Sequence, residues 1–181
     1  MKNIFKYLAV AAMSVALTGL VACDPEPKPE PEPAPDTTPS NYEESGSYAI
    51  QYHGDVLTAG QTINYYPTEE EFTNDLANFK FYINNKTDGN LSTCLKIEKM
   101  AGDDVMDNIM ICFGETCKSG VCPWISDPFN LVPGVNENLP IKFSYSPSLV
   151  TSTTKYRFTI GKGTDLEDPQ VMILNATAQA Q

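Results

Sequence analysis

The chain has 181 residues and a marked excess of acids, with 12 lysines and arginines against 23 aspartates and glutamates. Its formal net charge of −11 disfavours nucleic acids and anionic lipid headgroups as partners, because like charges repel. The 141 residues that follow residue 40 suffice for one hydrophobic core and hardly for two.

The first 22 residues have the pattern of a secretory signal peptide. Lys2 and Lys6 form a positive start, and the run from Tyr7 to Ala22 is apolar or small. A membrane-spanning helix needs about 20 apolar residues, so this shorter run favours a cleaved signal over a span. Its removal takes away two lysines and no acids, which leaves a net charge of −13.

The predicted signal ends in Leu20-Val21-Ala22-Cys23, which resembles the lipobox of bacterial lipoproteins. The resemblance implies cleavage just before Cys23 and acylation of its thiol. Each buried methylene contributes about 0.8 kcal/mol, so several lipid chains would hold the protein on a bilayer. We therefore predict that Cys23 is lipidated and that the membrane is a partner through this anchor.

Residues 23 to 45 are predicted to form a disordered tether. Between residues 24 and 40 lie seven of the chain's 14 prolines, and five acids against one lysine. Proline removes backbone donors and favours an extended polyproline-II rod. Such a rod would lift the domain that follows away from the membrane.

The tether carries two resemblances to Bacteroidota sequences. Asp24, Glu26 and Glu30 resemble the acidic signal with which that phylum displays lipoproteins on the outer face of the outer membrane. Asp36-Thr37-Thr38 resembles its O-glycosylation site, which implies Thr37 as the modified residue. The expected location is therefore the outer membrane, facing the cell exterior.

Strand patterns dominate residues 46 to 181, the predicted globular domain. Short segments alternate apolar and polar residues, and turn residues separate them at close intervals. The segments cover residues 48–53, 56–57, 62–66, 79–83, 95–99, 109–113, 141–145, 156–160 and 171–174. They predict an all-β fold, an antiparallel β-sandwich of about eight to nine strands. The last segment is apolar on both faces, which indicates a central strand.

One helical turn is expected between the third and fourth strands. Thr68 precedes Glu71 with the spacing of a capping box, so it can begin a helix. The segment is too short and too acidic for a core helix.

Little in the sequence points to catalysis or metal binding. His53 is the only histidine, and no GxSxG nucleophile motif accompanies it. Asp103, Asp104 and Asp107 lack the spacing and closing glutamate of an EF-hand. We expect no enzyme, no catalytic residue, no metal and no cofactor.

The stretch CPWISDPFNLVPG holds the candidate ligand contacts, Trp124 and Phe129. Aromatic side chains held by a rigid loop can stack on sugars or anchor a protein partner. The alternative is that Trp124, the only tryptophan, caps one end of the sandwich core.

Residues from about Gly46 to Ala176 resemble the immunoglobulin-like sandwich domain of Bacteroidota secreted and surface proteins. The resemblance rests on four segments together: YAIQYHGDVLTAGQTI, FKFYINNKTD, ICFGETC and LPIKFSYSPS with TTKYRFTI. That group shares no catalytic activity, so the resemblance implies a binding or spacer module.

Four cysteines follow Cys23, an even number that predicts two disulfides in an exported chain. Strand alternation allows Cys94 to bond Cys112 across neighbouring strands, with Cys117 bonding Cys122. The resemblance implies a Cys112–Cys117 bond, which leaves Cys94 to pair with Cys122. We favour this second arrangement.

The leading hypothesis for function is a non-enzymatic, surface-exposed lipoprotein that acts as a binding or envelope-complex module. One alternative is a glycan-capture lipoprotein that uses the loop aromatics. The other is a fimbrial or adhesin subunit, which would exchange strands between copies. The protein or glycan partner is not identified by the sequence.

Overall fold

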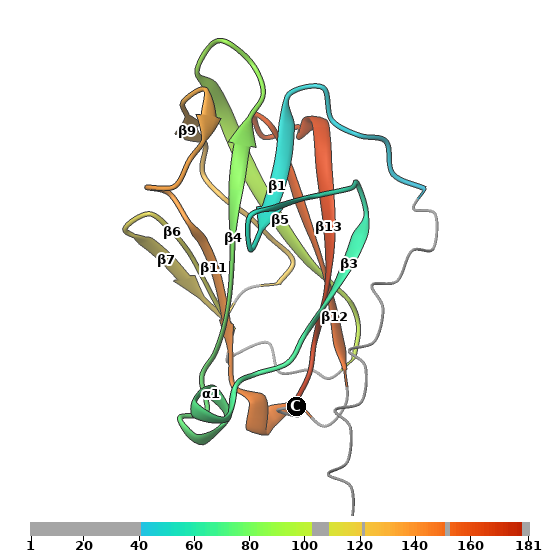
Figure 1. Cartoon of the computed structure of the whole chain (residues 1–181), viewed down its shortest axis with the longest axis vertical. Coiled ribbons are helices and arrows are strands. Elements are labelled where there is room, and N and C mark those ends of the chain that lie inside the picture. The colour runs from blue at the N-terminus through green and yellow to red at the C-terminus, as the bar shows by residue number, and fades with distance from the viewer. Residues whose placement is uncertain (1–40, 103–108, 121, 151–152, 179–181) are drawn as a thin grey trace, which may run out of the picture. The chain divides into compact units, whose positions relative to one another are not determined.

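The computed structural model describes residues 41–102, 109–120, 122–150 and 153–178, all within the unit Ala34–Gln181. Cys23, Thr37 and the three aspartates of residues 103–107 lie outside the described residues. The described part folds into two β-sheets that enclose one core (Figure 1). The predicted β-sandwich is confirmed.

The seven-stranded sheet has the order β2-β1-β4-β11-β6-β7, with β10 also paired to β4. Its strands are β1 (Tyr48–Tyr52), β2 (Asp55–Leu57), β4 (Ala77–Asn85), β6 (Met110–Phe113), β7 (Thr116–Ser119), β10 (Gly134–Val135) and β11 (Ile141–Tyr145). All of its pairings are antiparallel.

The six-stranded sheet has the order β3-β13-β12-β5-β8, with β9 also paired to β5. Its strands are β3 (Gln61–Tyr65), β5 (Leu91–Ala101), β8 (Trp124–Ile125), β9 (Phe129–Leu131), β12 (Thr154–Lys162) and β13 (Glu167–Ala176). Every predicted strand segment coincides with one strand of the two sheets. The short strands β7, β8, β9 and β10 were not predicted.

The core is aromatic and joins the two sheets. Phe143 of β11 lies 4.8 Å from Tyr156 and 5.4 Å from Phe158, both of β12, measured between ring centroids. Phe81 of β4 meets Phe158 edge to face at 5.5 Å. All four rings are fully buried or nearly so. The inward-facing residues expected from strand alternation are therefore confirmed for these strands.

Strand β13 lies between β3 and β12, as its apolar sequence predicted. Met172 and Leu174 point into the core, while Val171 and Ile173 on the other face are only 5% and 4% exposed. One of its neighbours departs from the antiparallel expectation, because β3 runs parallel to β13. The chain reaches β3 from β2 of the other sheet through a turn at Gly60, whose φ is +71°. The Gly60 N–H donates to the Val171 carbonyl at 2.8 Å, which fixes this crossing.

The predicted helical turn is present as α1 (Glu69–Thr73), with the Thr68–Glu71 capping box formed and none of its residues buried. The Tyr65 hydroxyl donates to both oxygens of Glu71, at 2.8 and 3.0 Å. Burial by itself raises the pKa of Glu71, but hydrogen bonds from Thr68, Tyr65 and the Asn78 backbone outweigh it and lower that pKa. A 3₁₀ turn, η2 (Pro147–Leu149), contacts α1 at the same end of the sandwich.

Candidate functional site

The two aromatic residues predicted as ligand contacts lie together at the edge of the sandwich. Trp124 of β8 lies opposite Ile97, and Phe129 of β9 lies opposite Thr93, so both side chains point to the core side of the sheet. Their rings lie 6.0 and 5.1 Å from that of Phe113 on β6. Both are half-buried and pack against the core. This arrangement fits the alternative of a core cap and leaves little aromatic face for a ligand.

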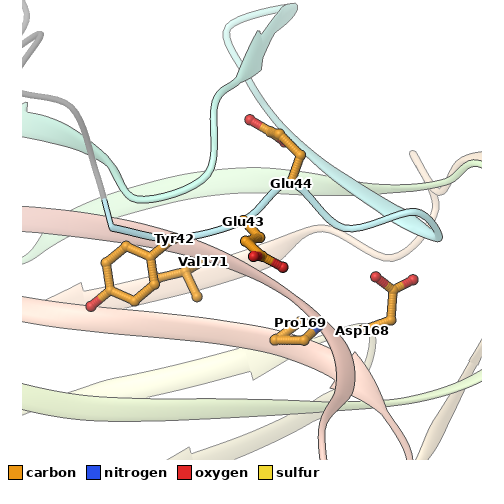
Figure 2. A pocket seen from close by; sticks show the side chains of 6 residues that line it. All are labelled: Tyr42, Glu43, Glu44, Asp168, Pro169 and Val171. Atoms are coloured by element: carbon orange, nitrogen blue, oxygen red, sulfur yellow. The ribbon is translucent and has the colours of Figure 1, made fainter.

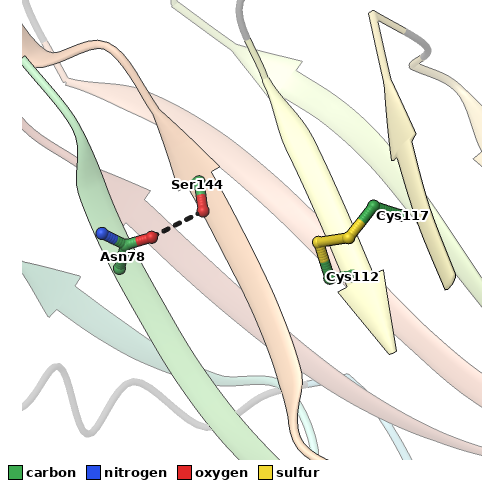
Figure 3. Close-up of a disulfide and its surroundings, with 4 residues drawn as sticks. All are labelled: Asn78, Cys112, Cys117 and Ser144. Atoms are coloured by element: carbon green, nitrogen blue, oxygen red, sulfur yellow. Dashed lines mark hydrogen bonds between the residues drawn. A yellow bond between two sulfur atoms is a disulfide. The ribbon is translucent and has the colours of Figure 1, made fainter. Parts of the chain in front are cut away.

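The predicted Cys112–Cys117 disulfide is present and joins β6 to β7 (Figure 3). The two residues are direct cross-strand partners, with Cα atoms 4.1 Å apart. Gly114 opens the two-residue turn of this hairpin with a φ of +56°. Because Ile111 and Phe113 face the core, the disulfide lies on the outward side, as expected from strand alternation.

The predicted Cys94–Cys122 bond is wrong, because both residues are free thiols. The Cys122 thiol lies 3.7 Å from the carbonyl oxygen of Ile97, which is three residues along β5 from Cys94. Three residues of strand span about 10 Å, whereas bonded cysteines keep their Cα atoms within about 7 Å. Cys122 also packs against the core, while Cys94 faces the other side of β5.

The alternative of a Cys94–Cys112 bond, with Cys117 bonded to Cys122, is wrong as well. Strands β5 and β6 belong to different sheets, and the cross-strand partner of Cys94 is Gly161 of β12. The outward side of each sheet faces away from the other sheet. Cys94 and Cys112 therefore lie on opposite sides of the sandwich.

Thiol labelling should separate these arrangements. We expect non-reducing peptide mapping to recover one peptide that joins Cys112 to Cys117, with Cys94 alkylated only after denaturation. Burial raises the pKa of the Cys94 and Cys122 thiols, which slows their reaction further. Cys122 is partly exposed and should label first. A peptide that joins Cys94 to any other cysteine would contradict the register described above.

Residues 42 to 47 form a clasp over the outward side of β13. Figure 2 shows Tyr42 beside Val171, with Glu43 and Glu44 on the same segment. Together with Asp168 and Pro169, these residues line a shallow pocket of about 190 Å³. The clasp explains why the outward side of β13 is buried. Its first residues precede residue 46, the predicted start of the domain.

Asp168 holds this clasp in place. Its carboxylate oxygens accept hydrogen bonds from the backbone N–H groups of Gly46 and Ser47, both at 2.8 Å. Burial alone raises the pKa of Asp168, but hydrogen bonds from Ser47, Gly46 and Ser45 outweigh it and hold that pKa below its usual range. Gln170 supports the clasp by accepting from the Ser45 N–H at 3.0 Å. The pocket is therefore a structural junction with an acidic rim, and it is poorly suited to an anionic ligand.

The outward side of the seven-stranded sheet has a different character, and we call it the basic face. Its side chains alternate with core residues along each strand, and they come from every strand of the sheet. They are Ala49, Gln51, Val56, Asn78, Lys80, Tyr82, Asn84, Met110, Cys112, Cys117, Ser119, Val135, Lys142 and Ser144. None of these outward-facing strand residues is a carboxylate, although the chain has 23 acids.

Two lysines lie side by side at the centre of the basic face. Lys80 of β4 and Lys142 of β11 are direct cross-strand partners, and both are exposed. The Lys80 ammonium lies 5.0 Å from the ring centroid of Tyr82. In the next row of the same two strands the Ser144 hydroxyl donates to the Asn78 amide oxygen at 2.8 Å (Figure 3). This face was not predicted from the sequence, because it depends on the pairing of β4 with β11.

Among the described residues, no group of three His, Cys, Asp or Glu side chains is arranged to hold a metal ion. No helix in the same residues is long and apolar enough to cross a membrane. His53 is exposed in the turn after β1 and stacks on Tyr52, with ring centroids 4.1 Å apart.

No family model matches the chain, and no curated protein matches its sequence. Among solved structures, the chain is similar to the N-terminal domain of PorA, with a TM-score of 0.49 and 15% identity, over 73% of this chain and 98% of that one. It is also similar to a FixG-related protein from Vibrio parahaemolyticus, with a TM-score of 0.37 and 11% identity, over 75% of this chain and 94% of that one. Scores this low carry no argument about function, so the fold assignment rests on the two sheets themselves.

Proposed function

We propose that this protein is a lipid-anchored binding module of the outer membrane, facing the cell exterior, with a Bacteroidota-type immunoglobulin-like sandwich. Cys23 carries the anchor, and the proline-rich residues after it hold the sandwich away from the bilayer. The lipobox-like LVAC and the alternation of proline with acid support this part of the proposal.

The basic face is the observation that carries the binding role. Both sides of a sandwich need a solvated exterior, and a chain with 23 acids and a net charge of −11 has many carboxylates to place on it. The outward-facing strand residues of this sheet include no carboxylate, and the two lysines at its centre form no ion pair with a described residue. Positive charge on one face of an acidic protein favours an anionic partner through electrostatic complementarity.

An enzymatic role has less support in the described residues. The single histidine, His53, lies in an exposed turn, and no hydrogen bond joins its ring to a described serine, threonine or cysteine. General-base catalysis by histidine needs a nucleophile within hydrogen-bond reach. We therefore propose a module that binds without chemical turnover.

Replacement of the lipid-bearing cysteine tests the anchor. We expect Cys23→Ala to leave the protein unacylated and to move nearly all of it from the membrane to the soluble fraction. Cys122→Ala is a matched control, because Cys122 is a free thiol in the sandwich and should leave the protein on the membrane. Fractionation followed by immunoblotting measures both. A Cys23→Ala protein that stays with the membrane at the wild-type level would contradict the anchor.

Display at the cell surface is tested separately, with protease added to intact cells. We expect the domain to be cleaved in intact cells at the rate seen after lysis. A domain that is protected in intact cells and cleaved after lysis would place the protein on the inner side of the outer membrane.

The two alternative functions have less support. Glycan capture by Trp124 and Phe129 would need exposed ring faces, and both rings pack against Phe113. A fimbrial or adhesin subunit would exchange strands between copies, and the chain's own strands fill both sheets in the described residues. We do not carry either alternative further.

A further inference from the structure

We infer that the basic face binds an acidic polysaccharide, one whose sugar rings carry carboxylate or sulfate groups. The inference rests on the proposed binding role and names the class of partner. The contact would centre on Lys80, Lys142 and Tyr82, with the amides of Gln51 and Asn84 beside them.

The two lysines favour an anion placed between them. Side chains directly opposite each other on neighbouring strands have Cβ atoms about 5 Å apart, and like charges in such pairs are destabilising. Lys80 and Lys142 form such a pair, and neither forms an ion pair with a described residue. On the other sheet, by contrast, Lys96 binds Glu98 at 2.9 Å. A carboxylate or sulfate placed between the two ammonium groups would remove their repulsion and be held by both.

The surroundings of the lysines suit a sugar. Tyr82 is half-buried, with Gln51 its direct cross-strand partner on β1, and Asn84 follows two residues along β4 on the same side. An aromatic ring stacks on the apolar face of a sugar, and amide side chains both donate to and accept from its hydroxyl groups. These groups lie on strands in the middle of a sheet, which fixes their spacing before a ligand arrives.

An acidic protein is a poorer fit to this face. The core of a protein interface is apolar and depleted in lysine, with charged groups at the rim. On this face the charged residues are central, because both lysines lie on the central strands β4 and β11. The exposed apolar residues Val56 and Val135, which are 59% and 37% exposed, lie on the short strands β2 and β10. A hydrated, extended polyanion matches a flat face with central positive charge better than a packed protein surface does.

The test measures binding of the protein as cells produce it, purified in detergent, to polygalacturonate at low ionic strength. We expect Lys80→Gln/Lys142→Gln to weaken binding about tenfold, which corresponds to about 1.4 kcal/mol and lies within the range for two exposed ion pairs. The matched control is Lys155→Gln/Lys162→Gln, which makes the same charge change on β12 of the other sheet and should leave binding within about twofold. Thermal unfolding should show both double variants folded.

Two further probes identify the class of ligand. Dextran has no charge and should not bind, which shows that the anion is required. Poly-glutamate carries carboxylates without sugar rings, so it should bind more weakly, and Tyr82→Leu should weaken polygalacturonate binding while leaving poly-glutamate binding unchanged.

Three results would overturn the inference. The first is that the protein binds neither polygalacturonate nor sulfated dextran. The second is that the Lys80/Lys142 variant and the Lys155/Lys162 variant lose the same amount of binding. The third is that poly-glutamate binds as tightly as polygalacturonate and Tyr82→Leu changes neither. The last result would point to an acidic protein partner. Because the measurement uses purified protein, it is independent of where the protein resides, so its failure is distinguishable from failure of the Cys23 and protease tests.

Discussion

Phe143→Ala is expected to lower the free energy of unfolding by about 3 to 5 kcal/mol, the range for removal of a buried phenylalanine. Phe143 is fully buried on β11, and its ring contacts Tyr145 of the same strand together with Tyr156 and Phe158 of the opposite sheet. Its removal would open a cavity between the sheets. The rigid strands on both sides cannot close that cavity.

A matched control is Phe72→Ala, because Phe72 of α1 is 47% exposed and lies outside the core cluster. This substitution should change the free energy of unfolding by about 0.5 kcal/mol or less. Urea denaturation, followed by tryptophan fluorescence of Trp124 and by circular dichroism, measures both. If Phe143→Ala proves too unstable to purify, Phe143→Leu leaves most of the volume filled and should cost less. Equal effects of Phe143→Ala and Phe72→Ala would contradict the described core.

Gly161→Ala is expected to destabilise the domain by about 2 to 3 kcal/mol, through a backbone collision rather than a lost contact. A Cβ atom at Gly161 would lie 2.5 Å from the Leu166 Cα and 2.6 Å from the Leu166 carbonyl carbon. The hairpin that joins β12 to β13 folds back tightly here, with Leu166 at a φ of +53°. Because the obstructing atoms are backbone, the hairpin itself must shift to admit the methyl group.

Gly89→Ala is the control for this prediction. A Cβ atom at Gly89 would meet no atom within 4 Å, and its φ is outside the left-handed region. The substitution should be neutral or slightly stabilising, since alanine restricts the unfolded chain more than glycine does. The same urea titration measures both variants. A Gly161→Ala variant as stable as Gly89→Ala would show that the hairpin does not cover Gly161 as described.

Local pattern was sufficient for much of this protein. The strands that became β1, β4, β5, β11 and β12 were predicted because alternation marks which side of a strand is buried, and burial of that side dominates its stability. The Thr68–Glu71 cap was predicted for the same kind of reason, since both hydrogen bonds of a capping box form within four residues. The Cys112–Cys117 bond closes within one hairpin too, but its prediction came from the family resemblance and not from alternation.

Features that depend on which distant strands meet were decided only by the tertiary structure. The strands β7 to β10 are two to four residues long, too short for alternation to show, and they exist because a neighbouring strand offers hydrogen bonds. The free thiols of Cys94 and Cys122 are another example, because β8 pairs with β5 in a register that puts Cys122 beside Ile97 and away from Cys94. The basic face also depends on which distant strands pair. Lys80 and Lys142 each alternate with core residues along their own strands, but only the pairing of β4 with β11 makes them neighbours, because register between distant strands is set by packing of the whole core.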